Sequence, residues 1–182
     1  MIKQTFKYLT IIIFLGIILS TIFYLVYPKT IYKILRISAI EISKHLVPSE
    51  RYDNKYGIHP YLLHKVNLAL NEAKQKGIDL RVVSGFRDRK KQQALYSQGR
   101  TTKGPIVTNA PPGLSYHNYG WAVDVCEYRN GKPYWKSKHW NEIGAIGKKH
   151  GLVWGGDWTR LVDKPHLQLS LFDILKISLK IE

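Results

Sequence analysis

The chain has 182 residues and a formal net charge of +15, because 28 Lys and Arg outnumber 13 Asp and Glu. Its single cysteine, Cys126, excludes an intrachain disulfide and a cysteine-rich zinc module, so any bound metal must be held by histidine and carboxylate. The basic residues are scattered over every segment with no basic helix or RNA-binding strand signature, which argues against nucleic acid and leaves anionic lipid or an acidic wall polymer as attracted partners.

The first predicted element is an uncharged run over residues 8–27, rich in Ile, Leu and Phe. As a helix, such a run spans ~30 Å, the thickness of the hydrocarbon core of a bilayer. A cleaved signal peptide is the alternative, but the run ends at Pro28 without a small-residue cleavage site. We therefore expect a retained transmembrane anchor over residues 1–28.

Residues 29–50 are expected to form a juxtamembrane amphipathic helix or linker that can lie on anionic lipid, and Pro48 is expected to end the helix. Its apolar residues recur at helical spacing; they are Ile31, Ile34, Leu35, Ile42 and Leu46. Basic residues after the anchor outnumber those before it, so the positive-inside rule alone would leave the following domain in the cytoplasm. The motifs of that domain nevertheless favour the opposite orientation.

Residues 51–182 suit one compact domain. Pro60 opens an amphipathic helical pattern, and Gly77 stands where a C-cap is expected. A short strand is predicted over residues 80–84, followed by a polar helix that Asp88 caps and that runs to about residue 98. The Gly- and Pro-rich residues 101–113 are expected to be a loop.

The second half of the domain alternates strands and helices. Residues 121–128 show the alternating pattern of a half-buried strand, and residues 137–150 the pattern of a helix that Gly151 ends. Short strands are predicted over residues 152–154 and 167–169. Together these elements predict an α+β fold in which helices pack on a small, mainly antiparallel sheet.

Three residues that follow this loop in the sequence are candidate metal ligands. His117 precedes Asp124 in one stretch, and Gly120 between them permits a turn that swings His117 to the Asp124 face of the strand. Small Ala122 leaves room for an ion on that face, and His166 supplies a third ligand. Two histidines and one carboxylate, with water in the open position, form a sound catalytic Zn²⁺ shell. Any one of these residues alone is more often a core histidine or a capping aspartate.

Two further residues are candidates for roles in hydrolysis. Asp163 stands close enough before His166 to act as general base on a water at the metal without binding the ion, with Asp157 as the rival carboxylate. Arg87, at a strand-to-helix turn, can stabilise the oxyanion on the attacked carbonyl, although a plain surface arginine is equally compatible with its position. Cys126 shares a face with Asp124 and is expected to be a small buried hydrophobe instead of a ligand.

The motifs resemble, in order, those of the D-Ala-D-Ala carboxypeptidase and L-Ala-D-Glu endopeptidase family of zinc peptidases, whose fold is shared with hedgehog signalling domains. They are residues 84–87 (SGFR), 115–124 (SYHNYGWAVD), 151–158 (GLVWGGDW) and 163–166 (DKPH). The resemblance implies Zn²⁺ held by His117, Asp124 and His166, an acidic base at Asp163 and a carbonyl-contacting arginine at Arg87.

The stretch at residues 155–158 looks most like the L-Ala-D-Glu endopeptidase branch, and an aromatic, Gly-rich rim there is expected to flank an open groove for a peptidoglycan stem. Substrate contacts are accordingly expected from Ser115, Trp154, Asp157 and Trp158. The expected protein is a monomeric, single-pass membrane enzyme with its catalytic domain facing the cell wall. A D-Ala-D-Ala carboxypeptidase and a non-catalytic wall-binding module are the alternatives.

Overall fold

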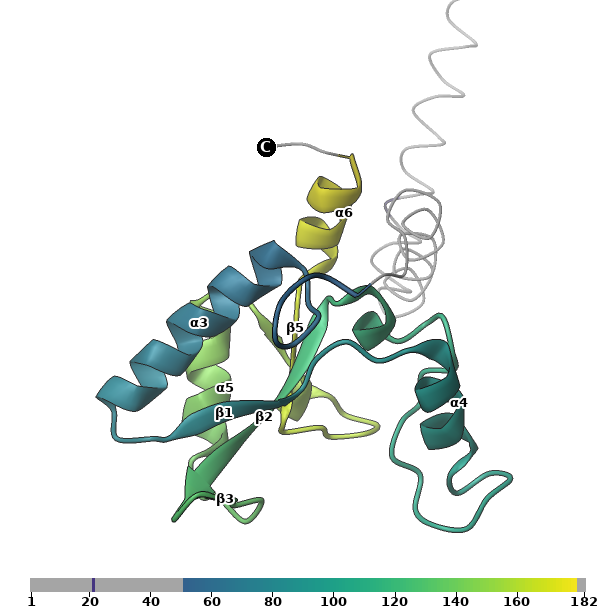
Figure 1. Ribbon diagram of the computed structural model, residues 1–182, viewed down its shortest axis with the longest axis horizontal. Helices are drawn as coiled ribbons and strands as arrows, with labels where there is room; N and C mark the ends of the chain where they lie inside the picture. The colour runs from purple at the N-terminus through teal and green to yellow at the C-terminus, as the bar shows by residue number, and fades with distance from the viewer. Residues whose placement is uncertain (1–20, 22–50, 180–182) are drawn as a thin grey trace, which may run out of the picture. The chain divides into compact units, whose positions relative to one another are not determined.

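The computed structural model describes Thr21 and residues 51–179 (Figure 1). The chain divides into two compact units, Met1–Ile40 and Glu41–Glu182, and the elements from α3 to α6 lie in the second unit.

Apart from Thr21, the predicted anchor at residues 1–28 and the juxtamembrane segment at residues 29–50 lie outside the described residues. Within the described part of the chain, no helix combines the length and the apolar character needed to cross a membrane.

A five-stranded sheet forms the centre of the second unit, with the strand order β1-β2-β5-β4 and β3 paired to the far end of β2. Every pair of neighbouring strands is antiparallel, as the sequence predicts. The strands are β1 (Leu80–Ser84), β2 (Ala122–Arg129), β3 (Lys132–Pro133), β4 (Val153–Trp154) and β5 (His166–Gln168). The central strand, β2, therefore connects the edge strand β1 to β5.

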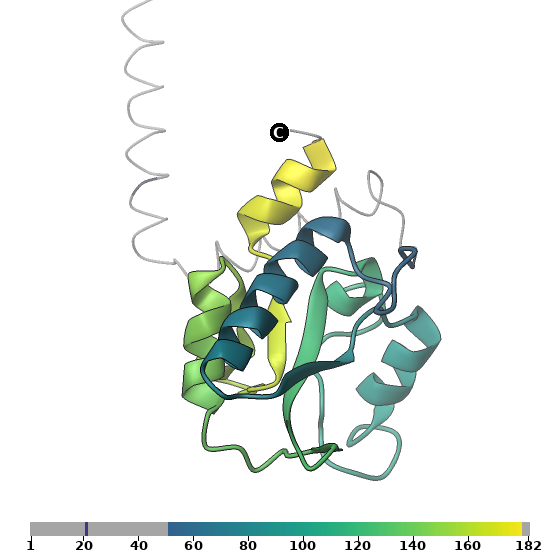
Figure 2. The ribbon, with the colours of Figure 1, turned by 60° about the vertical axis from the view of Figure 1, so that its left-hand side comes forward.

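Two helices, α3 (Pro60–Gln75) and α5 (Trp140–Lys149), lie side by side against the sheet (Figures 1 and 2). Their apolar stripes are buried with the side chains of Val123, Val125 and Leu167. These three side chains occupy one face of β2 and β5, because side chains alternate along a strand. The opposite face of the same strands consequently carries Asp124 and its neighbours.

The remaining helical elements lie around that second face and at the C-terminus. Helix α4 lies on the other side of β2 from α3 and α5 in both views (Figures 1 and 2). The elements are α4 (Arg89–Ser97), the 3₁₀ turns η1 (Tyr116–Tyr119) and η2 (Gly155–Asp157), and α6 (Leu171–Leu179). As predicted, Asp88 caps α4, accepting a hydrogen bond from the Lys91 backbone N–H at 2.7 Å.

Three elements differ from the sequence predictions. Helix α5 begins at Trp140 instead of residue 137, because the Ser137 hydroxyl donates to the buried carboxylate of Glu127 and its Oγ accepts the His139 N–H at 3.0 Å. The terminal helix α6 was not predicted from the sequence; its buried Asp173 forms an ion pair with Lys65 of α3 at 3.2 Å. Strand β3 was also not predicted, since two residues carry no readable alternation.

Candidate metal and catalytic site

Three side chains converge where β2 pairs with β5. Asp124 and His166 are direct cross-strand partners, so their side chains leave the sheet on the same face. His117 reaches this face from η1. The atoms Nε2 of His117, Oδ1 of Asp124 and Nδ1 of His166 lie 3.3 Å from one another in all three pairings. The structure thus brings together the three residues that the sequence predicts as metal ligands.

The spacing of these atoms fits a metal ion. A tetrahedral ion with bonds of ~2.0–2.1 Å holds neighbouring ligand atoms ~3.3 Å apart, and each separation here is 3.3 Å. Ordinary N–H···O hydrogen bonds are shorter, at about 2.9 Å. Two imidazole nitrogens and one carboxylate oxygen are also a donor set that Zn²⁺ accepts. The three residues can therefore hold a divalent cation on one face of a tetrahedron.

The local backbone places His117. Gly120 ends η1 with a φ of 66°, a left-handed conformation that glycine adopts without steric cost. This turn reverses the direction of the chain. As the sequence predicts, His117 and Asp124 therefore share a face, although in an unbroken strand they would lie on opposite faces. The Arg87 N–H donates to the His117 carbonyl at 3.0 Å, which attaches η1 to the turn after β1.

The electrostatics of the group suit a cation. Burial lowers the pKa of His117, which keeps its imidazole neutral and its lone pair available. Burial alone would raise the pKa of Asp124, but the imidazoles of His117 and His166 outweigh it and hold this pKa well below its usual value. Asp124 is therefore a carboxylate at neutral pH, and the site carries a negative charge to offer to a metal.

Arg87 lies beside this carboxylate. Its Nη2 forms an ion pair with Asp124 Oδ2 at 3.1 Å, the oxygen that does not face the histidines. Its Nη1 donates to Oε1 of the fully buried Gln92 at 3.0 Å, while its Nε is buried without a hydrogen-bond partner among the described residues. Arg87 is thus fixed at two corners of the guanidinium.

Asp163 stands on the loop before β5. Its backbone N–H donates to the Gly155 carbonyl at 3.0 Å, and a Cβ added to Gly155 would lie 2.5 Å from the Asp163 carbonyl oxygen. Burial raises the pKa of the Asp163 carboxyl, and His166, Asp124, His117 and Arg87 all act on that pKa electrostatically. The side chain is therefore a half-buried carboxyl beside the metal group. Glycine at position 155 permits the close approach of the Asp163 backbone.

Comparisons with known proteins agree with this geometry. The sequence model of the family described as D-alanyl-D-alanine carboxypeptidase matches residues 108–169, which include all three candidate ligands. The peptidoglycan L-alanyl-D-glutamate endopeptidase CwlK of Bacillus subtilis (strain 168) is 41% identical over 122 residues, covering 62% of this chain and 73% of CwlK. This chain belongs to the M15 peptidase family.

Two further relatives extend the comparison of this M15 peptidase. The L-alanyl-D-glutamate peptidase of Listeria phage A118 is 28% identical over 104 residues, which cover 56% of this chain and 34% of the phage protein. The crystal structure of the L-Ala D-Glu endopeptidase ChiX of Serratia marcescens superposes with a TM-score of 0.51 at 27% identity, covering 64% of this chain and 83% of ChiX.

The expected substrate-contacting residues of the peptidase occupy different environments. Trp158 is half-buried and its ring centroid lies 5.0 Å from that of His166, so it borders the site. Trp154 lies in the core, where its indole N–H donates to the Lys164 carbonyl at 2.7 Å. Asp157 is exposed and paired with Lys148 at 2.9 Å, and Ser115 is buried at the start of η1. Of the expected aromatic rim, only Trp158 therefore lies against the metal group.

Sequence reasoning missed several residues that support the site. Gln92 contacts Arg87, and Gln168 contacts His166. Asn118 is fully buried, donates to the Arg87 carbonyl at 2.6 Å and accepts from the Gly113 N–H at 2.9 Å. The signal for Gln168 was readable, because a residue two positions after a strand ligand shares its face. Cys126 is buried and stands outside the ligand group, as predicted.

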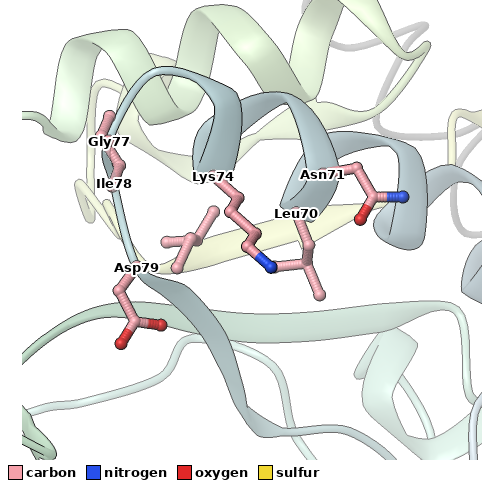
Figure 3. Close-up of a pocket in the computed structure, with 7 residues that line it drawn as sticks. Leu70, Asn71, Lys74, Gly77, Ile78 and Asp79 are labelled. Atoms are coloured by element: carbon pink, nitrogen blue, oxygen red, sulfur yellow. The ribbon is translucent and has the colours of Figure 1, made fainter.

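A separate hollow of about 480 Å³ lies between the end of α3 and the start of β1 (Figure 3). Leu80 on its wall pairs with Glu127, whereas the metal group lies at the other end of β1, where Ser84 pairs with Asp124. The carboxylate of its Asp79 is already paired with Arg81 at 2.7 Å. None of the candidate ligands, and neither Asp163 nor Arg87, lines this hollow.

Proposed function

We propose that this M15 peptidase is a zinc-dependent peptidoglycan hydrolase that cleaves the L-Ala-D-Glu bond of wall peptide stems. The observation that carries the proposal is the set of three ligand atoms 3.3 Å apart with the Asp163 carboxyl beside them. The choice of bond is supported by the 41% identity to a protein named for that activity. Zinc is supported by the donor set of two imidazoles and one carboxylate.

His117, Asp124 and His166 would hold the zinc ion. Bound there, zinc would supply Lewis-acid polarisation of the scissile carbonyl and make a water acidic enough to attack at neutral pH. The protein's own contribution begins with the protonation states, since the lowered pKa values of His117 and Asp124 keep one ligand neutral and the other anionic.

Asp163 is the proton carrier in this proposal. Its carboxylate is free of hydrogen bonds within the described structure, so it can accept a proton from the attacking water and pass it to the leaving amine nitrogen of D-Glu. Burial raises its pKa toward the working range of a general base. The rival carboxylate of Asp157 is exposed and already paired with Lys148, so it is less free to accept that proton.

Arg87 supplies the positive charge that balances the developing oxyanion. Two corners of its guanidinium are held by Asp124 Oδ2 and Gln92 Oε1, so the group needs no reorganisation during the reaction. The Arg87 side chain is 12% exposed, so its guanidinium is partly open toward a substrate oxygen.

The second candidate activity is D-Ala-D-Ala carboxypeptidase, because that is the description of the family model that matches residues 108–169. Digestion of purified muropeptides separates the two. An endopeptidase exposes new amino groups on D-Glu and leaves L-Ala attached to the glycan, whereas a carboxypeptidase releases free D-Ala. Free D-Ala as the main product would replace the endopeptidase assignment, and binding without cleavage would favour a wall-binding module.

We also propose that residues 1–28 anchor the protein in the cell membrane, that residues 29–50 connect the anchor to the domain, and that residues 51–182 form a monomeric peptidase domain facing the wall. The uncharged run at residues 8–27 supports the anchor. The orientation is supported by the substrate, since peptidoglycan lies outside the cytoplasm.

A further inference from the structure

The second ring nitrogen of His166 has a side-chain partner that the mechanism above does not use. Its Nε2 lies 3.0 Å from Oε1 of Gln168, and both side chains are buried. The other nitrogen, Nδ1, faces Nε2 of His117 and Oδ1 of Asp124 at 3.3 Å. The imidazole of His166 is therefore held between a neutral amide on one side and the metal group on the other.

This arrangement selects one tautomer. A neutral imidazole carries a single N–H, and an amide oxygen can only accept a hydrogen bond. When Gln168 presents Oε1, the proton of His166 resides on Nε2 and the lone pair on Nδ1 points at the metal group. If the amide were reversed, its NH₂ would require a lone pair on Nε2 and would place the proton on Nδ1, where it blocks a cation.

The sheet makes Gln168 a rigid partner. Gln168 and His166 alternate with Leu167 on β5, so both project from the same face. In the sheet, Gln168 is paired with Ala122 of β2 on one side and with Val153 of β4 on the other. Its backbone is thus held from both sides, and the position of its amide follows from the strand register.

The two histidines differ in how their rings are held. Nδ1 of His117 lies 2.7 Å from a main-chain oxygen, the carbonyl of Gly85, whereas His166 depends on a side chain. A substitution can displace a main-chain acceptor only by moving the backbone, whereas the amide of Gln168 can be removed by changing one side chain. The ring orientation of His166 consequently depends on one side chain, that of Gln168.

We propose that Gln168 is a positioning residue of the metal site, whose amide oxygen holds the His166 ring with Nδ1 directed at the ion. The inference rests on the zinc dependence proposed above and is independent of which bond the enzyme cleaves. Partners of this kind fix the ring and raise the basicity of the ligating nitrogen, and their loss weakens metal affinity about 10–100-fold.

The test compares two substitutions in the full-length chain. Gln168→Met retains the length of the side chain and removes the amide acceptor, while Gln168→Glu retains an acceptor oxygen at the same place. Leu167→Val is the matched control, because it changes the neighbouring buried residue on the opposite face of β5. Zinc affinity is measured by competition with a chromophoric chelator, and Co²⁺ absorption reports the ligand geometry.

The expected result is that Gln168→Met lowers zinc affinity about 10–100-fold and alters the Co²⁺ spectrum. Gln168→Glu should bind zinc at least as tightly as the native chain, because a carboxylate is the stronger acceptor. Leu167→Val should lower the unfolding temperature of the metal-free protein and leave both metal readouts unchanged.

Three outcomes would overturn the inference. Native zinc affinity with a native Co²⁺ spectrum in Gln168→Met would show that the hydrogen bond does not position His166. An equal loss of zinc affinity in Gln168→Met and Gln168→Glu, or a similar loss in Leu167→Val, would indicate that the substitutions act through the packing of β5 and not through the hydrogen-bond acceptor. A native chain that binds neither metal would contradict the proposed zinc dependence itself and with it the role of Gln168.

Discussion

Nδ1 of His117 lies 2.7 Å from the carbonyl oxygen of Gly85, so the first candidate ligand is oriented by the main chain just after β1. The same stretch carries Arg87, and the pairing of β1 with β2 shifts register between Val82 and Ser84. A register shift of this kind bends a strand and redirects the residues after it. The irregular end of β1 thus places both the acceptor for His117 and the guanidinium of Arg87.

Gly85→Ala should disrupt this arrangement. A Cβ at Gly85 would overlap the main-chain oxygen of Tyr56, which already accepts the Phe86 N–H at 2.9 Å. The turn must then move, which takes the Gly85 carbonyl away from His117. We expect zinc affinity to fall about tenfold or more, measured by chelator competition. Val83→Ala, at an exposed side chain of the same strand, should bind zinc normally, and equal losses in both variants would contradict the explanation.

Replacing any one ligand should remove the metal. His117→Ala, Asp124→Ala and His166→Ala each leave two donors, which is too few for a tightly held Zn²⁺. Elemental analysis of the purified variants should show little zinc, against one ion per native chain. Cys126→Ala should retain zinc and most activity, because this buried thiol lies outside the ligand group. Full occupancy in any of the three alanine variants would exclude that residue as a ligand.

Asp163→Asn should separate metal binding from chemistry. The amide cannot accept the proton of the attacking water, so hydrolysis of peptidoglycan should fall about 10²–10⁴-fold while zinc content stays unchanged. Asp157→Asn is the matched carboxylate control and should keep most of its activity, since Asp157 is paired with Lys148 at the surface. If Asp157→Asn were the inactive variant, the role of general base would pass to that residue.

Acid should destabilise the domain through Glu127. Burial raises the pKa of this carboxyl, but hydrogen bonds from Ser137, Arg129 and His139 outweigh burial and leave it below the ordinary value of 4.5. Because the folded pKa is the lower one, the stabilisation is complete above about 4.5 and is lost as the pH falls through the folded value. Denaturant unfolding of the native chain and Glu127→Gln should differ at neutral pH and converge in acid. A difference in the free energy of unfolding that is independent of pH would contradict this reasoning.

Protease digestion of intact spheroplasts tests the orientation of the chain. A wall hydrolase must meet its substrate outside the cytoplasm, so residues after Pro28 should be cleaved in cells whose membrane is unbroken. The lysines and arginines that follow the predicted anchor favour the reverse orientation. A fully protected domain would contradict both the orientation and the proposed substrate.

The α+β class and the candidate ligands could be predicted from the sequence because they depend on local patterns. Alternation over residues 121–128 predicted a half-buried strand with Asp124 on one face, and β2 extends over Ala122–Arg129. The turn at Gly120 could be anticipated since only a left-handed residue brings His117 to that face, and its φ is 66°. The choice of ligand types followed from having one cysteine.

Tertiary contacts decided the rest. The cross-strand pairing of Asp124 with His166, 42 positions apart, places both side chains on the same face of the sheet. The motif that contains Trp154 predicted a groove residue. Packing against α5 instead places Trp154 in the core, where Gly144 leaves room for its ring. Local periodicity says which face a side chain occupies; only the register between distant strands determines which residues share that face. The pairing of β2 with β5 therefore decided the metal site, with Gln168 beside His166.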